Sequence, residues 1–147
     1  MKNGEFVPLT LTEIKRGIKP VGRPIRILCE GVFDLFHIGH VEVLRQAKCA
    51  LPDIVLVSGV NTDEEVLEVK GHLPVMTFKE RLMALKTCRY VDEVIEDLPY
   101  FYTVDWLNKH QIDLVAHDDL PYVPNVLGEN SPMFHFYDQF KVSKRQA

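Results

Sequence analysis

Hydrophobic positions fall into two kinds of pattern that alternate along the chain. Residues 25–29 and 54–60 form continuous apolar runs rich in isoleucine and valine, which is typical of strands covered on both faces. Shorter runs at 91–95 and 114–116 predict two further strands. The sequence therefore predicts four buried strands.

Helical spacing appears between these runs. Val41, Leu44 and Ala47 recur on one face and predict a helix over residues 39–50. Thr77 followed by Glu80 is a capping-box pattern, which predicts the start of a second helix. Short helices are expected at 103–110 and, near the N-terminus, at 12–16.

Strands that alternate with helices predict an α/β fold, a Rossmann-like doubly wound parallel sheet with helices on both faces. In such folds ligands bind beyond the carboxyl ends of the strands. The residues to search are therefore those that follow Cys29, Val60, Ile95 and Ala116.

Length and composition limit the kinds of protein that this chain can be. The 147 residues suffice for one domain, expected at 25–147, with residues 1–24, rich in proline and glycine, as an N-terminal leader. A net charge of −4 gives no reason to expect nucleic-acid binding. No apolar run approaches the ~18–20 residues of a transmembrane helix. Without a secretory signal, and with three widely spaced cysteines, we expect reduced thiols and a cytoplasmic location.

The first strand end carries two histidines around a glycine, His37-Ile38-Gly39-His40, where the chain enters a helix. A helix N-terminus offers unpaired N–H groups, and imidazoles can donate hydrogen bonds to phosphate oxygens. The glycine would let backbone and nucleotide approach closely. The alternative is a metal site, with Asp34 or His117 as a third ligand, which the strand-end position disfavours.

The segment from Gly31 to His40 resembles the nucleotide-binding signature of the cytidylyltransferase family. Further blocks match in the same order: Val69-Lys70-Gly71, Cys88 to Val94, and Ala116 to Tyr122. These blocks most resemble the choline-phosphate branch of the family. The resemblance implies transfer of CMP from CTP to phosphocholine, which gives CDP-choline and pyrophosphate for phosphatidylcholine biosynthesis.

By this resemblance His37, His40 and Lys70 would be catalytic, with the two histidines stabilising the CTP triphosphate and Lys70 neutralising charge from a flexible loop. Gly31, Phe33 and Gly39 would complete the nucleotide site, and Mg²⁺ would accompany CTP. Without the family context, Lys70 would be interpreted as a solvated surface lysine.

The acceptor site implied by the resemblance must hold a quaternary ammonium, which aromatic faces and a carboxylate bind. Tyr100 and Tyr122 supply the aromatic faces, Asp118 the carboxylate, and His117 could orient the site. Two positions depart from the family pattern: Glu30 stands where aspartate is usual, and Tyr100 where tryptophan is usual.

The family also has a second signature, Arg-Thr-Glu-Gly-Ile-Ser-Thr-Thr, which binds the triphosphate. Arg145 stands at its expected place, but Gln146-Ala147 follows. We therefore expect either a fragment of a longer enzyme or a weakened hold on CTP.

Three alternatives remain. The acceptor could be ethanolamine phosphate, or the chain could be a catalytically impaired homologue that acts as a binding or dimerisation partner. The His-x-Gly-His turn is also found in class I aminoacyl-tRNA synthetases, which the length and charge disfavour. In the resembled family residues 89–94 lie at a two-fold interface, so a homodimer through Arg89–Val94 is expected.

Overall fold

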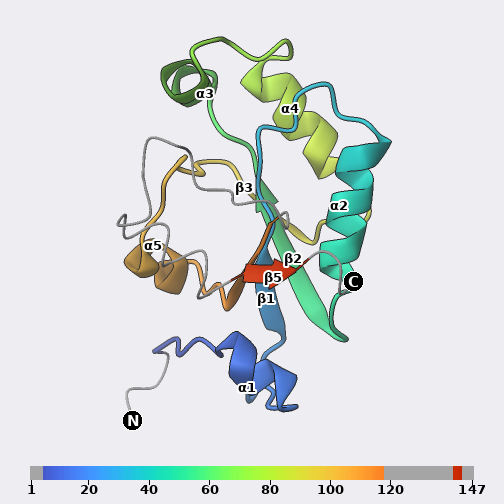
Figure 1. Cartoon of the computed structure of the whole chain (residues 1–147), viewed down its shortest axis with the longest axis vertical. Helices are drawn as coiled ribbons and strands as arrows, with labels where there is room; N and C mark the ends of the chain where they lie inside the picture. Colours follow the sequence, from blue (N-terminus) through green and yellow to red (C-terminus); the bar gives the residue numbers. More distant parts are fainter. Residues whose placement is uncertain (1–4, 118–140, 144–147) are drawn as a thin grey trace.

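The computed structural model describes residues 5–117 and 141–143. Its centre is a parallel sheet of five strands in the order β3-β2-β1-β4-β5 (Figure 1). The strands are β1 (Ile25–Leu28), β2 (Ile54–Gly59), β3 (Glu93–Ile95), β4 (Leu114–His117) and β5 (Lys141–Ser143). The predicted α/β class is therefore confirmed.

The strand order reverses at β1. The chain first moves from β1 to β2 and β3 on one side, and β4 then pairs with the opposite edge of β1. In the part of the chain that the structure describes, five helices connect or flank these strands: α1 (Leu11–Lys15), α2 (Ile38–Lys48), α3 (Asp63–Lys70), α4 (Phe78–Lys86) and α5 (Val104–Lys109). The boundary between β1 and β4 is thus the topological switch point, where an open α/β sheet places its ligand.

Apolar side chains on the two faces of the sheet form two cores. Leu44 of α2 and Leu85 of α4 pack on one face, in a cluster that includes Ile27 and Leu56. Leu107 of α5 packs on the other, in a cluster that includes Leu28, Val57 and Val115. Figure 1 shows α2 and α4 on one side of the sheet and α5 on the other. This arrangement explains why the strands are apolar on both faces.

The N-terminal segment is fastened to this domain. Ile14 of α1 is buried in the first core. The fully buried carboxylate of Asp113 accepts hydrogen bonds from Leu9 N–H and Arg26 N–H, both at 2.9 Å, and from Arg23 at 2.7 and 2.8 Å. The described part of residues 1–24, which the sequence analysis set apart as a leader, therefore contributes to the packing of the domain.

Two elements were not predicted from the sequence. The helix α3 has a Thr62 N-cap, three acidic residues in its first turn and a Gly71 C-cap. These signals are present in the sequence, but the sequence analysis expected a flexible loop around Lys70 and did not predict the helix. The strand β5 has three residues and exists through its pairing with β4. No helix in the described residues is long and apolar enough to cross a membrane.

Candidate active site

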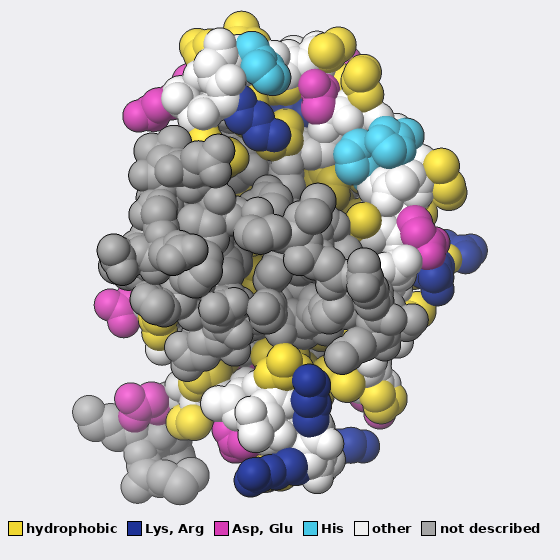
Figure 2. Space-filling model, in the orientation of Figure 1, with side chains coloured by type: hydrophobic (Ala, Val, Ile, Leu, Met, Phe, Trp, Pro, Cys, Tyr) yellow, Lys and Arg dark blue, Asp and Glu magenta, His cyan; other side chains and the backbone are white. Residues whose placement is uncertain are grey.

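A cavity of about 330 Å³ lies at the switch point, beyond the carboxyl end of β1. The residues that line it come from the loop after β1, from α2, α3, the loop after α3, and β4: Cys29, Glu30, Gly31, Val32, Phe33, Asp34, His40, Val43, Val66, Lys70, His72, Pro74 and Ala116. Figure 2 shows histidine side chains at two places on this side of the molecule, one of them beside a basic side chain. The cavity thus includes the segment after Cys29, the first of the strand ends at which the sequence analysis expected a ligand.

His37 and His40 cap the helix that begins beside the cavity. His37 is the N-cap of α2, and its Nδ1 accepts a hydrogen bond from Gly39 N–H at 2.9 Å. His40 Nδ1 accepts in turn from the backbone N–H of His37 at 3.1 Å. Because an Nδ1 that accepts a hydrogen bond carries no proton, each neutral ring must carry its proton on Nε2. Both histidines are therefore fixed as Nε2–H donors.

Aromatic packing holds His40 in place. Its ring stacks on Phe36 with centroids 5.5 Å apart, and the edge of Phe33 meets it at 5.6 Å. The ring of His37 lies 4.1 Å away. Burial, followed by the nearby His37, lowers the pKa of His40, although Asp34 opposes the shift. His40 is therefore neutral at pH 7, in agreement with its role as a hydrogen-bond acceptor at Nδ1.

Gly39 is required by the position of His37. A Cβ added at Gly39 would lie 2.6 Å from Cε1 of the His37 ring and 3.0 Å from its Nδ1. The His37 ring therefore occupies the space of the missing side chain. The structure thus gives this glycine a role in seating the histidine, and the close approach of a nucleotide that the sequence analysis expected there stays a prediction.

The loop that leads into these histidines has an unusual backbone. Phe33 and Leu35 have φ values of 52° and 48°, in the left-handed region that side chains other than glycine rarely adopt. The Asp34 carboxylate between them accepts hydrogen bonds from Val75 N–H at 2.7 Å and Met76 N–H at 2.9 Å. Asp34 thereby ties this loop to the loop before α4, which helps to hold the strained conformation.

These contacts also set the charge of Asp34. Burial raises its pKa, but hydrogen bonds from the N–H groups of Met76, Val75 and Leu35 outweigh burial, so the pKa lies below the ordinary value. Asp34 was considered above as a metal ligand. Its oxygens instead bind backbone N–H groups, and no cluster of three or more metal-ligating side chains occurs in the described part of the chain.

Arg81 also supports the loop that contains Asp34. Its side chain, on α4, is fully buried and donates to Val32 O at 2.8 Å and to Met76 O at 3.2 Å. It also donates to the carboxylate of Asp63, at the start of α3, at 2.7 Å. One guanidinium thus joins the loop of the cavity to the beginnings of α3 and α4. Sequence analysis missed it because an arginine inside an amphipathic helix gives no sign of burial.

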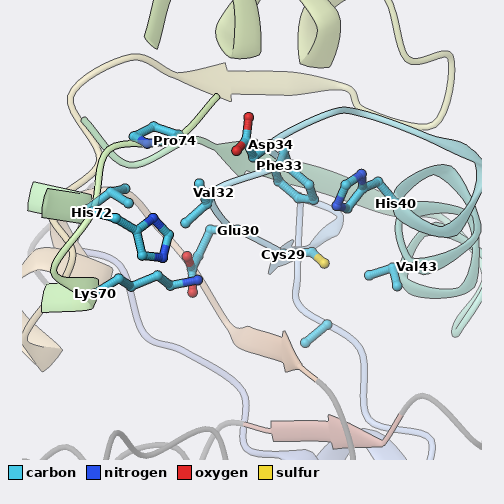
Figure 3. A pocket seen from close by; sticks show the side chains of 13 residues that line it. Cys29, Glu30, Val32, Phe33, Asp34, His40, Val43, Lys70, His72 and Pro74 are labelled. Atoms are coloured by element: carbon cyan, nitrogen blue, oxygen red, sulfur yellow. The ribbon is translucent and has the colours of Figure 1, made fainter. Parts of the chain in front are cut away.

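Lys70 and His72 enter the cavity from the side opposite His40 (Figure 3). Lys70 is the last residue of α3, not part of a flexible loop as the sequence analysis expected, so a helix positions it. Gly71, with φ of 81°, ends the helix, and His72 follows in the next loop. His72 was not among the predicted site residues, since the notable signal there was the lysine–glycine pair.

Glu30 and Tyr100 lie near one another at this end of the cavity. Glu30 lines the cavity, and Figure 3 shows its carboxylate facing the side chains of Lys70 and His72. Tyr100 is not among the lining residues, but burial and then the charge of Glu30 raise the pKa of its hydroxyl. An aromatic side chain thus lies within electrostatic reach of a carboxylate. Glu30, which the sequence analysis noted only as a departure from the family pattern, is thus part of the cavity wall.

The other predicted site residues are placed as follows. Gly31 lines the cavity, and Phe33 both lines it and packs against His40. His117 is the last residue of β4, so its backbone lies beside the cavity edge formed by Ala116. Asp118, Tyr122 and Arg145 lie outside the described residues.

Comparison with known proteins identifies the family. Residues 28–142 match the model of the cytidylyltransferase-like family. The chain is 49% identical over 106 residues to the choline-phosphate cytidylyltransferase of Saccharomyces cerevisiae, covering 72% of this chain and 25% of that protein. It is 40% identical over 117 residues to the ethanolamine-phosphate cytidylyltransferase of Dictyostelium discoideum, covering 78% and 32%.

A solved structure has the same fold. The lipopolysaccharide core biosynthesis protein from Thermoplasma volcanium superposes with a TM-score of 0.61 at 20% identity, covering 82% of this chain and 93% of that one. The chain spans about a quarter to a third of the length of the two cytidylyltransferases named above. The family match covers most of the chain and includes the cavity, so this chain belongs to the cytidylyltransferase-like family.

Proposed function

We propose that this domain transfers CMP from CTP to phosphocholine and releases pyrophosphate. The observation that carries the proposal is the composition of the cavity. His40 on one wall, with His37 beside it, and Lys70 on the other wall supply hydrogen-bond donors and positive charge for phosphates. Glu30, with Tyr100 nearby, supplies the carboxylate and aromatic face that a quaternary ammonium requires.

The reaction needs no covalent intermediate on the protein. An oxygen of the phosphocholine phosphate attacks the α-phosphorus of CTP, and the bond from that phosphorus to the β-phosphate oxygen breaks. The substrate oxygen is already anionic, and the negative charge leaves on pyrophosphate, so no proton must be transferred. The Nε2–H groups of His37 and His40 stabilise the charge that develops, and Lys70 neutralises the phosphates.

We expect Mg²⁺ to enter with CTP. Such an ion would be held mainly by the phosphate oxygens and by water. The site residues above would then bind the metal–nucleotide complex through the phosphates.

The test is pyrophosphate release from CTP and phosphocholine with Mg²⁺. We expect turnover by the protein and its loss in His37→Ala, His40→Ala and Lys70→Ala. His110→Gln is a matched control, because His110 packs on Trp106 of α5 with ring centroids 4.2 Å apart and does not line the cavity. No turnover and no binding of millimolar CTP by titration calorimetry would contradict the proposal and favour a binding or dimerisation partner.

Ethanolamine phosphate is the second candidate acceptor, because a relative at 40% identity carries that name. A primary ammonium can donate hydrogen bonds, whereas a trimethylammonium depends on the aromatic face. Comparison of kcat/KM for the two acceptors separates them. Equal loss of both activities in Tyr100→Ala, or a preference for ethanolamine phosphate, would contradict the choice of phosphocholine.

We also propose a homodimer through residues 89–94. The side chain of Arg89 is exposed, and its guanidinium carbon lies 4.9 Å from the centre of the Tyr90 ring. Asp92 and Glu93 are already paired within the chain, with Lys48 and Arg26. Arg89 and Tyr90 would therefore supply the intersubunit contacts. Sedimentation at micromolar concentration should give twice the chain mass, and Arg89→Glu should give a monomer.

A further inference from the structure

His72 lies on the same wall of the cavity as Lys70, yet it belongs to no matched motif. We propose that His72 binds the phosphate group of the acceptor substrate and takes up one proton from solvent as that phosphate binds. This inference rests on the proposed function and identifies a further residue for it.

The turn after α3 brings His72 to the cavity. Gly71 adopts φ of 81° and its N–H bonds to Leu67 O at 2.9 Å, which ends the helix and redirects the chain. The residues on either side of the glycine, Lys70 and His72, therefore both line the cavity. Figure 3 shows the imidazole of His72 beside Glu30, across the cavity from His40.

The protonation of His72 differs from that of the two capping histidines. Its Nδ1 lies 3.2 Å from Leu73 O, and because a carbonyl oxygen only accepts, a hydrogen bond between them requires the tautomer with a proton on Nδ1. In the neutral ring Nε2 then presents a lone pair, which would repel a phosphate oxygen. His37 and His40 present Nε2–H instead. His72 can therefore donate to a phosphate only after it gains a second proton.

The charged groups around the cavity favour that step when a phosphobase binds. Glu30 and Lys70 face His72 on its own side, His40 lies across the cavity, and Asp34 also lines it. A phosphate dianion adds two negative charges and favours protonation of the imidazole. The ammonium group of the same substrate would pair with Glu30.

The first test measures kcat/KM for phosphocholine from pH 6 to 9 in the wild type, His72→Phe and His72→Gln. Loss of a charge-assisted hydrogen bond predicts a reduction of about tenfold or more at the acid end. The ratio of wild type to variant should approach one at the alkaline end, where Nε2 has lost its proton. The substrate's own titration cancels in this ratio. KM for CTP should change less than twofold.

The second test measures proton uptake by titration calorimetry with phosphocholine in buffers of different ionisation enthalpy. The wild type should take up more protons than His72→Phe. Leu73→Ala is the matched control, because Leu73 is exposed in the same loop and does not line the cavity. Equal kcat/KM at every pH, or equal uptake, in an active wild type would overturn the role of His72 alone. A wild type without turnover would instead overturn the proposed function and this inference together.

Discussion

The imidazole of His37 lies over Gly39, with its Nδ1 2.9 Å from the Gly39 nitrogen. This contact caps α2 and fixes the ring as an Nε2–H donor. It also requires residue 39 to lack a side chain, since a Cβ there would lie 2.6 Å from the ring. The orientation of the His37 ring therefore depends on the glycine at position 39, so substitutions at either position should test this contact.

Gly39→Ala should reduce activity without a large change in stability. The added methyl group displaces the His37 ring, so we expect kcat/KM to fall by about tenfold or more, through loss of an oriented donor. Alanine in a helix gains roughly 0.5–1 kcal/mol over glycine, which offsets the loss of about 1 kcal/mol from the cap. Urea unfolding together with kinetics checks this. Wild-type activity in Gly39→Ala would contradict the requirement for space.

His37→Asn should separate capping from chemistry. Asparagine is a good N-cap residue, so the free energy of unfolding should stay within about 0.5 kcal/mol of the wild type, whereas His37→Ala should lose about 1 kcal/mol. Both variants should lose pyrophosphate release, because neither has an imidazole Nε2–H. An Asn variant that keeps activity would show that His37 serves only as a cap.

His40 should titrate below the ordinary histidine range in an NMR pH titration, with its proton on Nε2. Burial and the neighbouring His37 lower its pKa, so His37→Asn should move that pKa upward. The unfolded chain binds this proton at higher pH than the folded protein does. Stability from neutral His40 is therefore complete above the unfolded pKa and is lost as pH falls through the folded one. An Nδ1–H signal would contradict the hydrogen bond from His37 N–H.

Arg81→Met should destabilise the protein by roughly 3 kcal/mol, because it removes a buried cation and leaves the Val32 and Met76 carbonyl oxygens without this donor. Lys86→Met is the matched control on the same helix, since the Lys86–Glu96 pair is exposed and should contribute less than about 1 kcal/mol. Denaturant unfolding measures both. Equal losses in the two variants would show that Arg81 does not brace the cavity loop.

Asp113→Asn should loosen the N-terminal segment. The amide nitrogen takes the place of one acceptor oxygen and faces the two donors of that oxygen, which are Arg23 and the backbone N–H of either Leu9 or Arg26, so we expect a loss of roughly 3 kcal/mol. Limited trypsin digestion should cut near Lys19 faster than in the wild type. Asp97→Asn, at an exposed position, is the control and should cut at the wild-type rate.

Local patterns were sufficient for most of the fold. The apolar runs at 25–29 and 54–60 and the capping box at Thr77 correspond to β1, β2 and α4. These elements have strong periodicity and start signals within a few residues, so neighbours in the sequence specify them. The strand-end rule also located the histidine turn beside the cavity.

The partners of each side chain depended on contacts between segments far apart in the sequence. Asp34 binds Val75 and Met76, Arg81 binds Val32, and Asp113 binds Leu9 and Arg23. No periodic pattern encodes such pairs, because they exist only when loops from different strands meet. The composition of the cavity, with Glu30 and His72 beside Lys70, was decided in the same way.

The sequence by itself therefore determined the α/β class, the order of most elements and the histidine-glycine turn, since these follow from spacing along one segment. The tertiary structure alone decided that the His37 ring occupies the space beside Gly39 and that His72 enters the cavity. The physical reason is that a site at a switch point is assembled from the ends of several strands and helices, whose relative positions only the packed sheet fixes.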